Sequence, residues 1–275
     1  MRRGQRLLTL ASYAWVLVFL AVVLFPVLWI GLQSLKSYFD VIAVPPRFIF
    51  TPTLANYHSV LADTGFLRAA LDSLVVSVGA VCLSLAIGVP FAYAISRFDF
   101  RGREDLAFFI LSTRMLPAIV VIVPFVQIFN RIGLIDSYAG LILAHVLVCI
   151  ALVVWVMRGF FNAIPIELDE AAIVDGASPL RTFFSIILPL ARPGLVSVAS
   201  LSFLLSWNEF LFALSLTSFD VRTLPVFMAT EFIGFLAVDW ARLSAAGIMA
   251  TLPIVVLVAV LQRHLVSGLS LGAVK

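Results

Sequence analysis

The sequence predicts an all-α integral membrane protein: a polytopic bundle of six transmembrane helices with a helix-turn-helix on one face. Composition is the first reason, because 63% of the 275 residues are hydrophobic, 12% are charged and the mean hydropathy is +1.14. So little polar surface cannot cover a soluble domain of this length. The second reason is six apolar runs, each long enough to cross a hydrocarbon core of about 30 Å as a helix of about 20 residues. They cover residues 10–33, 69–95, 105–129, 139–157, 194–216 and 244–262, within a single domain of residues 1–275.

The first run is interpreted as an uncleaved span. Residues 1–6 are basic like the start of a secretory signal, but the apolar run that follows continues past Trp29 and is too long for one. If the N-terminus is cytoplasmic, 11 basic residues fall inside and six outside, an excess that predicts both termini inside. The inside set is Arg2, Arg3, Arg6, Arg97, Arg101, Arg103, Arg158, Arg181, Arg192, Arg263 and Lys275; the outside set is Lys36, Arg47, Arg68, Arg131, Arg222 and Arg242.

The sequence lacks several motifs that are typical of enzymes, and their absence argues against an enzymatic function. The two lysines, Lys36 and Lys275, lack the glycines of a phosphate-binding loop, so ATP cannot be bound by that route. No His-Glu-x-x-His motif or Gly-x-Ser-x-Gly elbow occurs. Cys82 and Cys149 lie within predicted spans, and the three scattered histidines are each interpreted as structural. No metal site, cofactor or nucleic-acid partner is therefore expected.

A polar island, Glu167 to Pro179, interrupts the apolar sequence between the fourth and fifth spans, inside a loop of residues 158–192. Pro165 is suited to a helix start, and acidic residues follow in the first turn, where they face the positive end of the helix dipole. Gly176 is suited to the left-handed residue that ends a helix, and Ser178 to the N-cap of the next one. The island therefore predicts a helix-turn-helix, which is too apolar to project freely into water.

The same residues resemble a known motif. Glu170-Ala171-Ala172, followed by Asp175-Gly176-Ala177 and then by Leu188-Pro189 and Pro193, is similar to the cytoplasmic "EAA" loop of permease subunits of binding-protein-dependent ABC importers. Further matches resemble the maltose-type carbohydrate branch, in particular its smaller six-span permease. They are Asn56-Tyr57, Tyr93-Ala94 with Arg97-Phe98, Met115 with Pro117, Pro124, Gly133-Leu134, Trp207-Asn208-Glu209, and Gly268-Leu269 with Gly272-Ala273-Val274-Lys275. Asp72-Ser73 departs from the family's usual Asn-Ser, and whether Asp72 keeps the structural role of that amide or adds a charge stays open.

The resemblance implies a half-pore in the cytoplasmic (inner) membrane of a bacterium or archaeon. It implies four kinds of partner: a second permease subunit, two ATPase subunits that bind ATP and Mg²⁺, an extracytoplasmic solute-binding protein, and a sugar or polyol solute. The island would be a coupling helix seated on the ATPase, with Glu170 pairing with a basic residue there. The residues implied in this coupling are Glu170, Ala171, Ala172, Asp175, Gly176, Ala177, Leu188 and Pro189, with Gly268, Leu269, Gly272 and Lys275 reaching the ATPase from the C-terminal tail.

Charged residues within spans are costly and are the first candidates for the solute path or its gate. Arg114 and Glu209 lie in the third and fifth predicted spans, and Asn208 precedes Glu209. At 1.5 Å per residue the two charges differ in depth by about 9 Å. A mutual ion pair, contact with solute, and separate partners are all open. Pro117 and Pro124 are expected to kink the third span.

The best interpretation is a transmembrane subunit of an ATP-driven importer for sugars or related solutes, with no ATP site of its own. The alternative is a channel or scaffold subunit without ATP-coupled transport; a channel would conduct solute without nucleotide.

Overall fold

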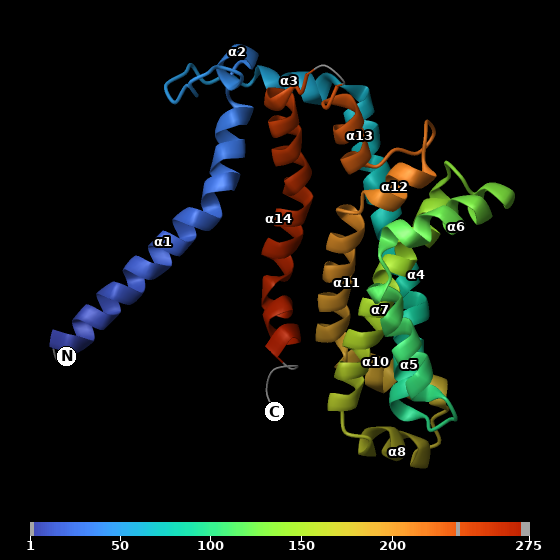
Figure 1. Cartoon of the computed structure of the whole chain (residues 1–275). Coiled ribbons are helices and arrows are strands. Elements are labelled where there is room, and N and C mark those ends of the chain that lie inside the picture. Colours follow the sequence, from blue (N-terminus) through green and yellow to red (C-terminus); the bar gives the residue numbers. More distant parts are fainter. Residues whose placement is uncertain (1–2, 235–236, 271–275) are drawn as a thin grey trace. The chain divides into compact units, whose positions relative to one another are not determined.

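The computed structural model describes the backbone of residues 3–234 and 237–270 and the side chains of residues 9–234 and 237–261. Apart from one bridge between Ile233 and Val238, the regular elements of this part of the chain are helices, as predicted. The α-helices are α1 (Arg3–Ser34), α2 (Tyr38–Val41), α3 (Ala55–Ala62), α4 (Thr64–Arg97), α5 (Arg103–Ser112), α6 (Ala118–Arg131), α7 (Tyr138–Ala163), α8 (Glu167–Val174), α9 (Pro179–Thr182), α10 (Leu188–Leu190), α11 (Arg192–Trp207), α12 (Leu211–Leu216), α13 (Leu224–Glu231) and α14 (Trp240–Ser270) (Figure 1).

Four of these helices contain segments long and apolar enough to span a membrane alone: Thr9–Ser34, Thr64–Arg97, Tyr138–Ala163 and Trp240–Leu261. Two further spans are possible if each of two bent pairs counts as one. In the first pair, Arg103–Met115 and Ala118–Arg131 meet at 99°; in the second, Pro179–Leu190 and Arg192–Trp207 meet at 77°. The described chain is thus an all-helical membrane protein with four to six candidate spans.

The predicted third span, residues 105–129, is divided in two. After α5 a 3-10 turn, Thr113–Met115, leads to Leu116, which is extended at ψ 126°, and α6 begins after Pro117. A residue before proline is pushed away from the helical region, so Pro117 ends the helix. Pro124, by contrast, lies inside α6. The expected kink therefore occurs at the first of the two prolines as a full break.

The chain divides into two compact units, residues 1–67 with 228–252 and residues 68–227 with 253–275. In the first unit, Asn56 and Tyr57 hold the end of α1. The Asn56 side-chain amide donates to the carbonyls of Ser34 and Lys36, both at 2.8 Å, and the Tyr57 hydroxyl lies 2.7 Å from the Ser34 hydroxyl. Lys36 is buried, with its ammonium 5.1 Å from the centre of the Trp29 ring. The Asn56-Tyr57 motif therefore closes the turn after α1.

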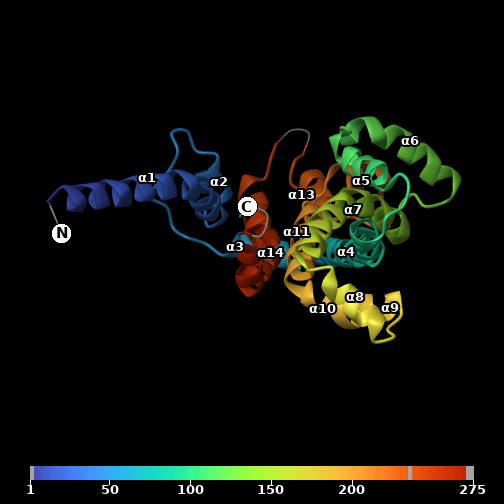
Figure 2. The same ribbon diagram turned by 90° about the horizontal axis from the view of Figure 1, so that it is seen from below.

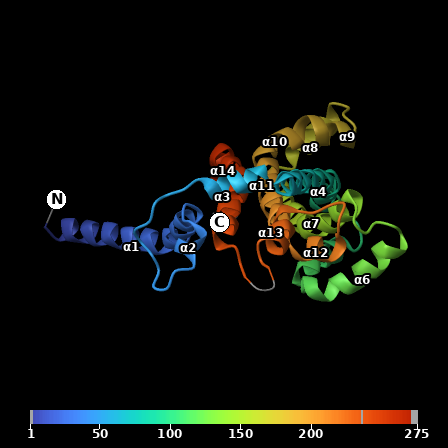
Figure 3. The same cartoon turned by 90° about the horizontal axis from the view of Figure 1, so that it is seen from above.

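The second unit is built around α7, which packs along α11 (Figure 1) and also against α5 and α12. Figure 3 shows α12 between α7 and α6, and it contacts both. Two apolar clusters fill this unit. One joins α4 and α7 to the α9–α11 segment, with Tyr93, Met157, Phe161 and Phe183 among its members, and the other joins α6, α7 and α12 around Phe129, Leu141 and Phe212.

Candidate functional site

The polar island folds as the predicted helix-turn-helix, with α8 and α9 as its arms (Figure 2). Gly176 has φ +82°, in the left-handed region that favours glycine. Its amide donates to the carbonyl of Ile173, and the Ala177 amide donates to the carbonyl of Ala172, each at 2.9 Å. These two bonds form a Schellman motif, which satisfies the last carbonyls of α8.

The second arm begins as predicted at Ser178, whose hydroxyl accepts a hydrogen bond from the amide of Arg181 at 3.3 Å, and Pro179 is the first helical residue. After α9 the backbone widens into one π-helical turn, Phe183–Ile187, and then continues through α10. Pro189 lies in this short helix, just before the 77° bend into α11. The arm is therefore connected directly to a membrane helix.

Asp169, in the first turn of α8, anchors the hairpin to the end of α4. The Tyr93 hydroxyl donates to one of its carboxylate oxygens at 2.6 Å, and Nε of Arg97 lies 3.0 Å from the other. Arg97 also donates to the carbonyl of Ile164 at 2.8 Å, just before α8. Asp169 is only 7% exposed. The motif with Tyr93 and Arg97 is visible in the sequence, but their common partner, Asp169, was not predicted.

Other apolar side chains of the hairpin are exposed in the described chain. Ile173, Val174, Leu180 and Phe184 are 58%, 86%, 71% and 60% exposed. Among the predicted coupling residues, Glu170, Ala171, Asp175 and Gly176 are exposed, Ala172 is buried, and Ala177, Leu188 and Pro189 are half-buried. The hairpin thus presents acidic and apolar side chains together, which is the chemistry of a docking surface. Of the predicted tail residues, Gly268 and Leu269 belong to the end of α14, while Gly272 and Lys275 lie outside the described residues.

The break between α5 and α6 exposes Arg114, which lies in the 3-10 turn. This arginine lines two cavities of about 460 and 670 Å³. Among the described side chains it is the only charged residue that lines either cavity, and no carboxylate of that set lies within 4 Å of it. The larger cavity is also lined by Asn208 and by leucines of α7 and α11. The structure therefore brings two of the three predicted path residues to one cavity.

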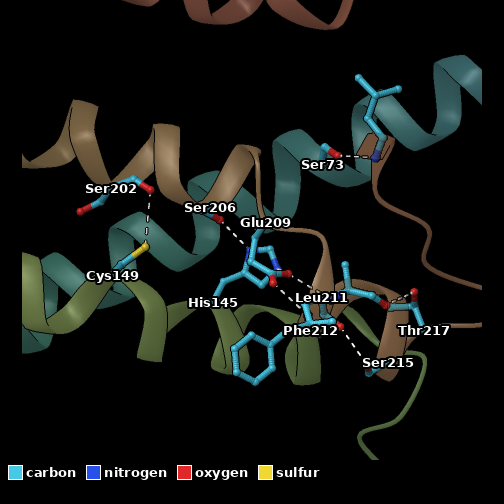
Figure 4. Close-up of polar contacts among 12 residues, drawn as sticks. Ser73, His145, Cys149, Ser202, Ser206, Glu209, Leu211, Phe212, Ser215 and Thr217 are labelled. Carbon is cyan, nitrogen blue, oxygen red and sulfur yellow. Dashed lines mark hydrogen bonds and ion pairs between the residues drawn. The ribbon is translucent and has the colours of Figure 1, made fainter. Parts of the chain in front are cut away.

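Glu209 is the third predicted path residue, and its surroundings are different (Figure 4). Its carboxylate accepts hydrogen bonds from the amides of Phe212 at 2.9 Å and Ala213 at 3.1 Å, which caps the start of α12. The same carboxylate lies 3.3 Å from Nε2 of His145 on α7, and the two side chains are 9% and 0% exposed. The suggested ion pair between Arg114 and Glu209 is therefore wrong in this structure, because helix capping and a buried imidazole occupy the carboxylate.

His145 is the partner of Glu209 that was not predicted from the sequence. Its Nδ1 lies 2.7 Å from the hydroxyl of Ser206, in the last turn of α11. An imidazole in the middle of an apolar span was the available signal, but its partners are more than 60 residues away and no local pattern identifies them.

Two aspartates hold the loop that follows α12. Asp136, at φ +55°, accepts hydrogen bonds from the amides of four successive residues, 218–221, at 2.8–3.2 Å. Partial burial alone would raise the pKa of Asp136, but these four amides outweigh it and lower the pKa. Asp72 accepts from the Tyr138 hydroxyl at 2.6 Å and from the Arg222 amide at 3.0 Å, and Ser73 accepts from the Leu224 amide at 2.7 Å. Asp72 thus acts as a hydrogen-bond acceptor that holds this loop.

Known proteins resemble this chain over most of its length. Residues 80–271 match the family model for the inner membrane component of binding-protein-dependent transport systems. The trehalose transport permease SugB of Mycobacterium tuberculosis is 37% identical over 258 residues, covering 92% of each chain. The trehalose/maltose transport permease MalG of Thermococcus litoralis is 35% identical over 261 residues, covering 92% of this chain and 91% of the relative.

A solved structure shares the fold. A subunit of a bacterial ABC transporter that imports the acidic polysaccharide alginate superposes with a TM-score of 0.81 at 24% identity, covering 96% of this chain and 98% of that one. In importers of the matched family, ATPase activity lies on subunits separate from the permease. The chain belongs to the family of binding-protein-dependent transport system inner membrane components, and it is the multi-pass permease component of an ABC importer.

Proposed function

We propose that this chain is one of two different permease subunits of a carbohydrate importer. The names of several relatives support the solute class, since they describe transport of trehalose, maltose or diacetylchitobiose. The observation that carries the coupling role is the hairpin itself, because an exposed apolar and acidic face is joined to α4 by a buried ion pair. The whole chain, residues 1–275, would act as one permease domain.

In this proposal the hairpin is the coupling element. The exposed residues Ile173, Val174 and Leu180 pack on an ATPase subunit, and Glu170 pairs with a basic residue there. Because Asp169 ties α8 to Arg97 of α4, and α10 continues into α11, a rigid-body movement of the ATPase reaches both membrane helices. The C-terminal residues 268–275 supply a second contact with the ATPase.

The solute path follows the larger cavity. Arg114 and Asn208 are its polar lining residues, and both can form hydrogen bonds to sugar hydroxyls. A volume of about 670 Å³ is in the range of small-molecule sites, about 300–1,000 Å³. Its remaining walls are leucines, so the second permease subunit would complete the path with its own polar groups.

The orientation we propose, with both termini cytoplasmic, rests on the 11-to-six distribution of basic residues. Single cysteines at Ser178 and Phe219, both exposed, test it in a background without Cys82 and Cys149. A membrane-impermeant maleimide added to intact cells is expected to label position 219 and to leave position 178 unlabelled. The reverse pattern would overturn the orientation.

Reconstitution tests the function. The chain, its second permease subunit and the ATPase are placed in liposomes with the binding protein and with radiolabelled trehalose, maltose or diacetylchitobiose. We expect accumulation of at least one sugar that requires both ATP and the binding protein. Sugar flux that is independent of nucleotide would instead indicate a channel, and ATP-dependent uptake of a non-carbohydrate solute alone would overturn the solute class.

A further inference from the structure

The helical backbone is interrupted between α11 and α12, and side chains hold this break. Helix α11 ends at Trp207, and the six-residue helix α12 begins at Leu211. A helix of this length is unstable alone, because helix nucleation is costly. Glu209, inside the break, supplies acceptors for the amides of Phe212 and Ala213. The carboxylate therefore does for α12 what an N-cap does for other helices.

A single side chain from α7 contacts both sides of this break. Nδ1 of His145 lies 2.7 Å from the Ser206 hydroxyl on the last turn of α11, and its Nε2 lies 3.3 Å from the Glu209 carboxylate (Figure 4). Because an imidazole has one polar nitrogen on each side of its ring, Nδ1 can hydrogen-bond the hydroxyl while Nε2, which has no hydrogen-bond partner within the described chain, lies within ion-pair distance of the carboxylate. His145 is fully buried and lies within the 26-residue helix α7, so the contact comes from a neighbouring long helix.

Asn208 lies between the two residues that this tie holds. It is the C-cap of α11, and its side-chain amide donates to the Leu204 carbonyl at 2.8 Å. Its exposed side chain lines the cavity of about 670 Å³ that Arg114 also lines. The position of Asn208 along this cavity therefore depends on Ser206 before it and Glu209 after it, and both are held by His145.

We propose that His145 and Glu209 are a positioning pair that holds the break between α11 and α12 and so places Asn208 in the solute path. The inference rests on the proposed function only in assigning Asn208 to that path. Glu209 is then neither a gate nor a solute ligand, because its side chain is buried against α7 and α12. A buried carboxylate that loses its partner is costly, whereas removing the carboxylate together with its partner is tolerated better.

The test measures where residue 208 is. In the assembled complex, Asn208→Cys is introduced in a background without Cys82 and Cys149, and its modification rate by N-ethylmaleimide is measured. His145→Leu is expected to speed modification at least about fivefold. Leaving a buried polar group without its partner costs at least about 1 kcal/mol, which corresponds to about fivefold in the equilibrium that opens the break. Glu209→Gln added to His145→Leu is expected to bring the rate back to within about twofold of the wild-type rate, since the carbonyl oxygen of the neutral amide can still accept from an amide of α12.

Ser202→Ala is the matched control. Ser202 lies one turn before Ser206 on α11, is buried, and its hydroxyl has no hydrogen-bond partner within the described chain, so its loss should leave the rate unchanged. An unchanged rate in His145→Leu, or a double variant as fast as His145→Leu alone, would overturn the proposal. If His145→Leu does not assemble, assembly of the double variant supports the pair, and failure of both contradicts it. ATP-dependent sugar uptake by the wild type is measured in parallel, so that failure of the proposed function is seen separately.

Discussion

Two connections between successive helices in this protein, one at Gly176 and one at Asn208, are stabilised in different ways. At Gly176, between α8 and α9, the turn is closed by backbone bonds to Ala172 and Ile173 and by the hydroxyl of Ser178, all within a few residues. At Asn208, between α11 and α12, the break is closed by Glu209 and by His145, which lies 61 residues before its partner Ser206. The first turn is local in sequence, and the second depends on tertiary contacts.

The turn at Gly176 and the break at Asn208 are suited to different roles when the helices move. A turn that closes on itself can move as a unit, which suits a hairpin that transmits movement of an ATPase. A break tied to a neighbouring helix moves only with that helix, which suits a wall of a solute cavity. The four predictions below test this contrast, from the largest expected effect to the smallest.

The largest effect is expected where the local hairpin depends on a distant helix, at Asp169. Asp169→Asn leaves Arg97 buried without its carboxylate, and breaking one side of a buried pair costs about 3–5 kcal/mol. We expect a lower melting temperature in detergent and loss of ATPase co-purification. Glu167→Gln, an exposed carboxylate in the same first turn, is the control. Equal behaviour of the two variants would show that the ion pair does not hold the hairpin.

Gly176→Val tests the local turn itself. The positive φ of Gly176 is unfavourable for a β-branched residue by about 1–2 kcal/mol, so the hairpin should be misplaced and solute uptake reduced. The matched variant is Gly159→Val on α7, where an added Cβ meets nothing within 4 Å and φ is not positive. Uptake and ATPase co-purification at wild-type levels in Gly176→Val would contradict a coupling role for this turn.

Asp136 offers a pH test of a tertiary clamp. Its folded pKa is lowered below the usual 3.8, so its stabilising effect is complete above that pH and is lost as the pH falls through the lowered folded value. Asp136→Asn should therefore melt earlier than the wild type at pH 7, and the difference should shrink below about pH 3.8. Asp220→Asn, an exposed aspartate in the clamped loop, is the control. A difference that stays constant with pH would exclude the charged carboxylate as the cause.

The smallest effect is an absence of coupling between Arg114 and Glu209. Because Glu209 contacts His145 and caps α12, Arg114→Gln and Glu209→Gln should change the free energy of unfolding independently, with effects that add to within about 0.5 kcal/mol. The cycle of His145→Leu with Glu209→Gln should be strongly non-additive under the same conditions. Coupling in the first cycle and none in the second would restore the ion pair that the structure contradicts.

The sequence predicted the parts of the site that depend on short-range signals. Gly176, Ser178 and Pro179 marked the hairpin correctly, because turn and cap residues act on backbone groups only a few positions away. Pro117 marked the break in the third span for the same reason. The exact length of the fifth span was not predictable, since α11 ends at Trp207 inside an apolar run that continues to residue 216.

By itself, then, the sequence determined that the protein lies in a lipid bilayer, that it is helical, where the helix-turn-helix lies, and that it resembles importer permeases. These features depend on composition, on the length of apolar runs and on turn residues, which are all local properties of the sequence. The tertiary structure decided which polar groups meet: Asp169 with Tyr93 and Arg97, and Glu209 with His145 instead of Arg114. A buried polar group must find a partner wherever the packing places one. That partner can lie anywhere along the chain, so no local pattern specifies it.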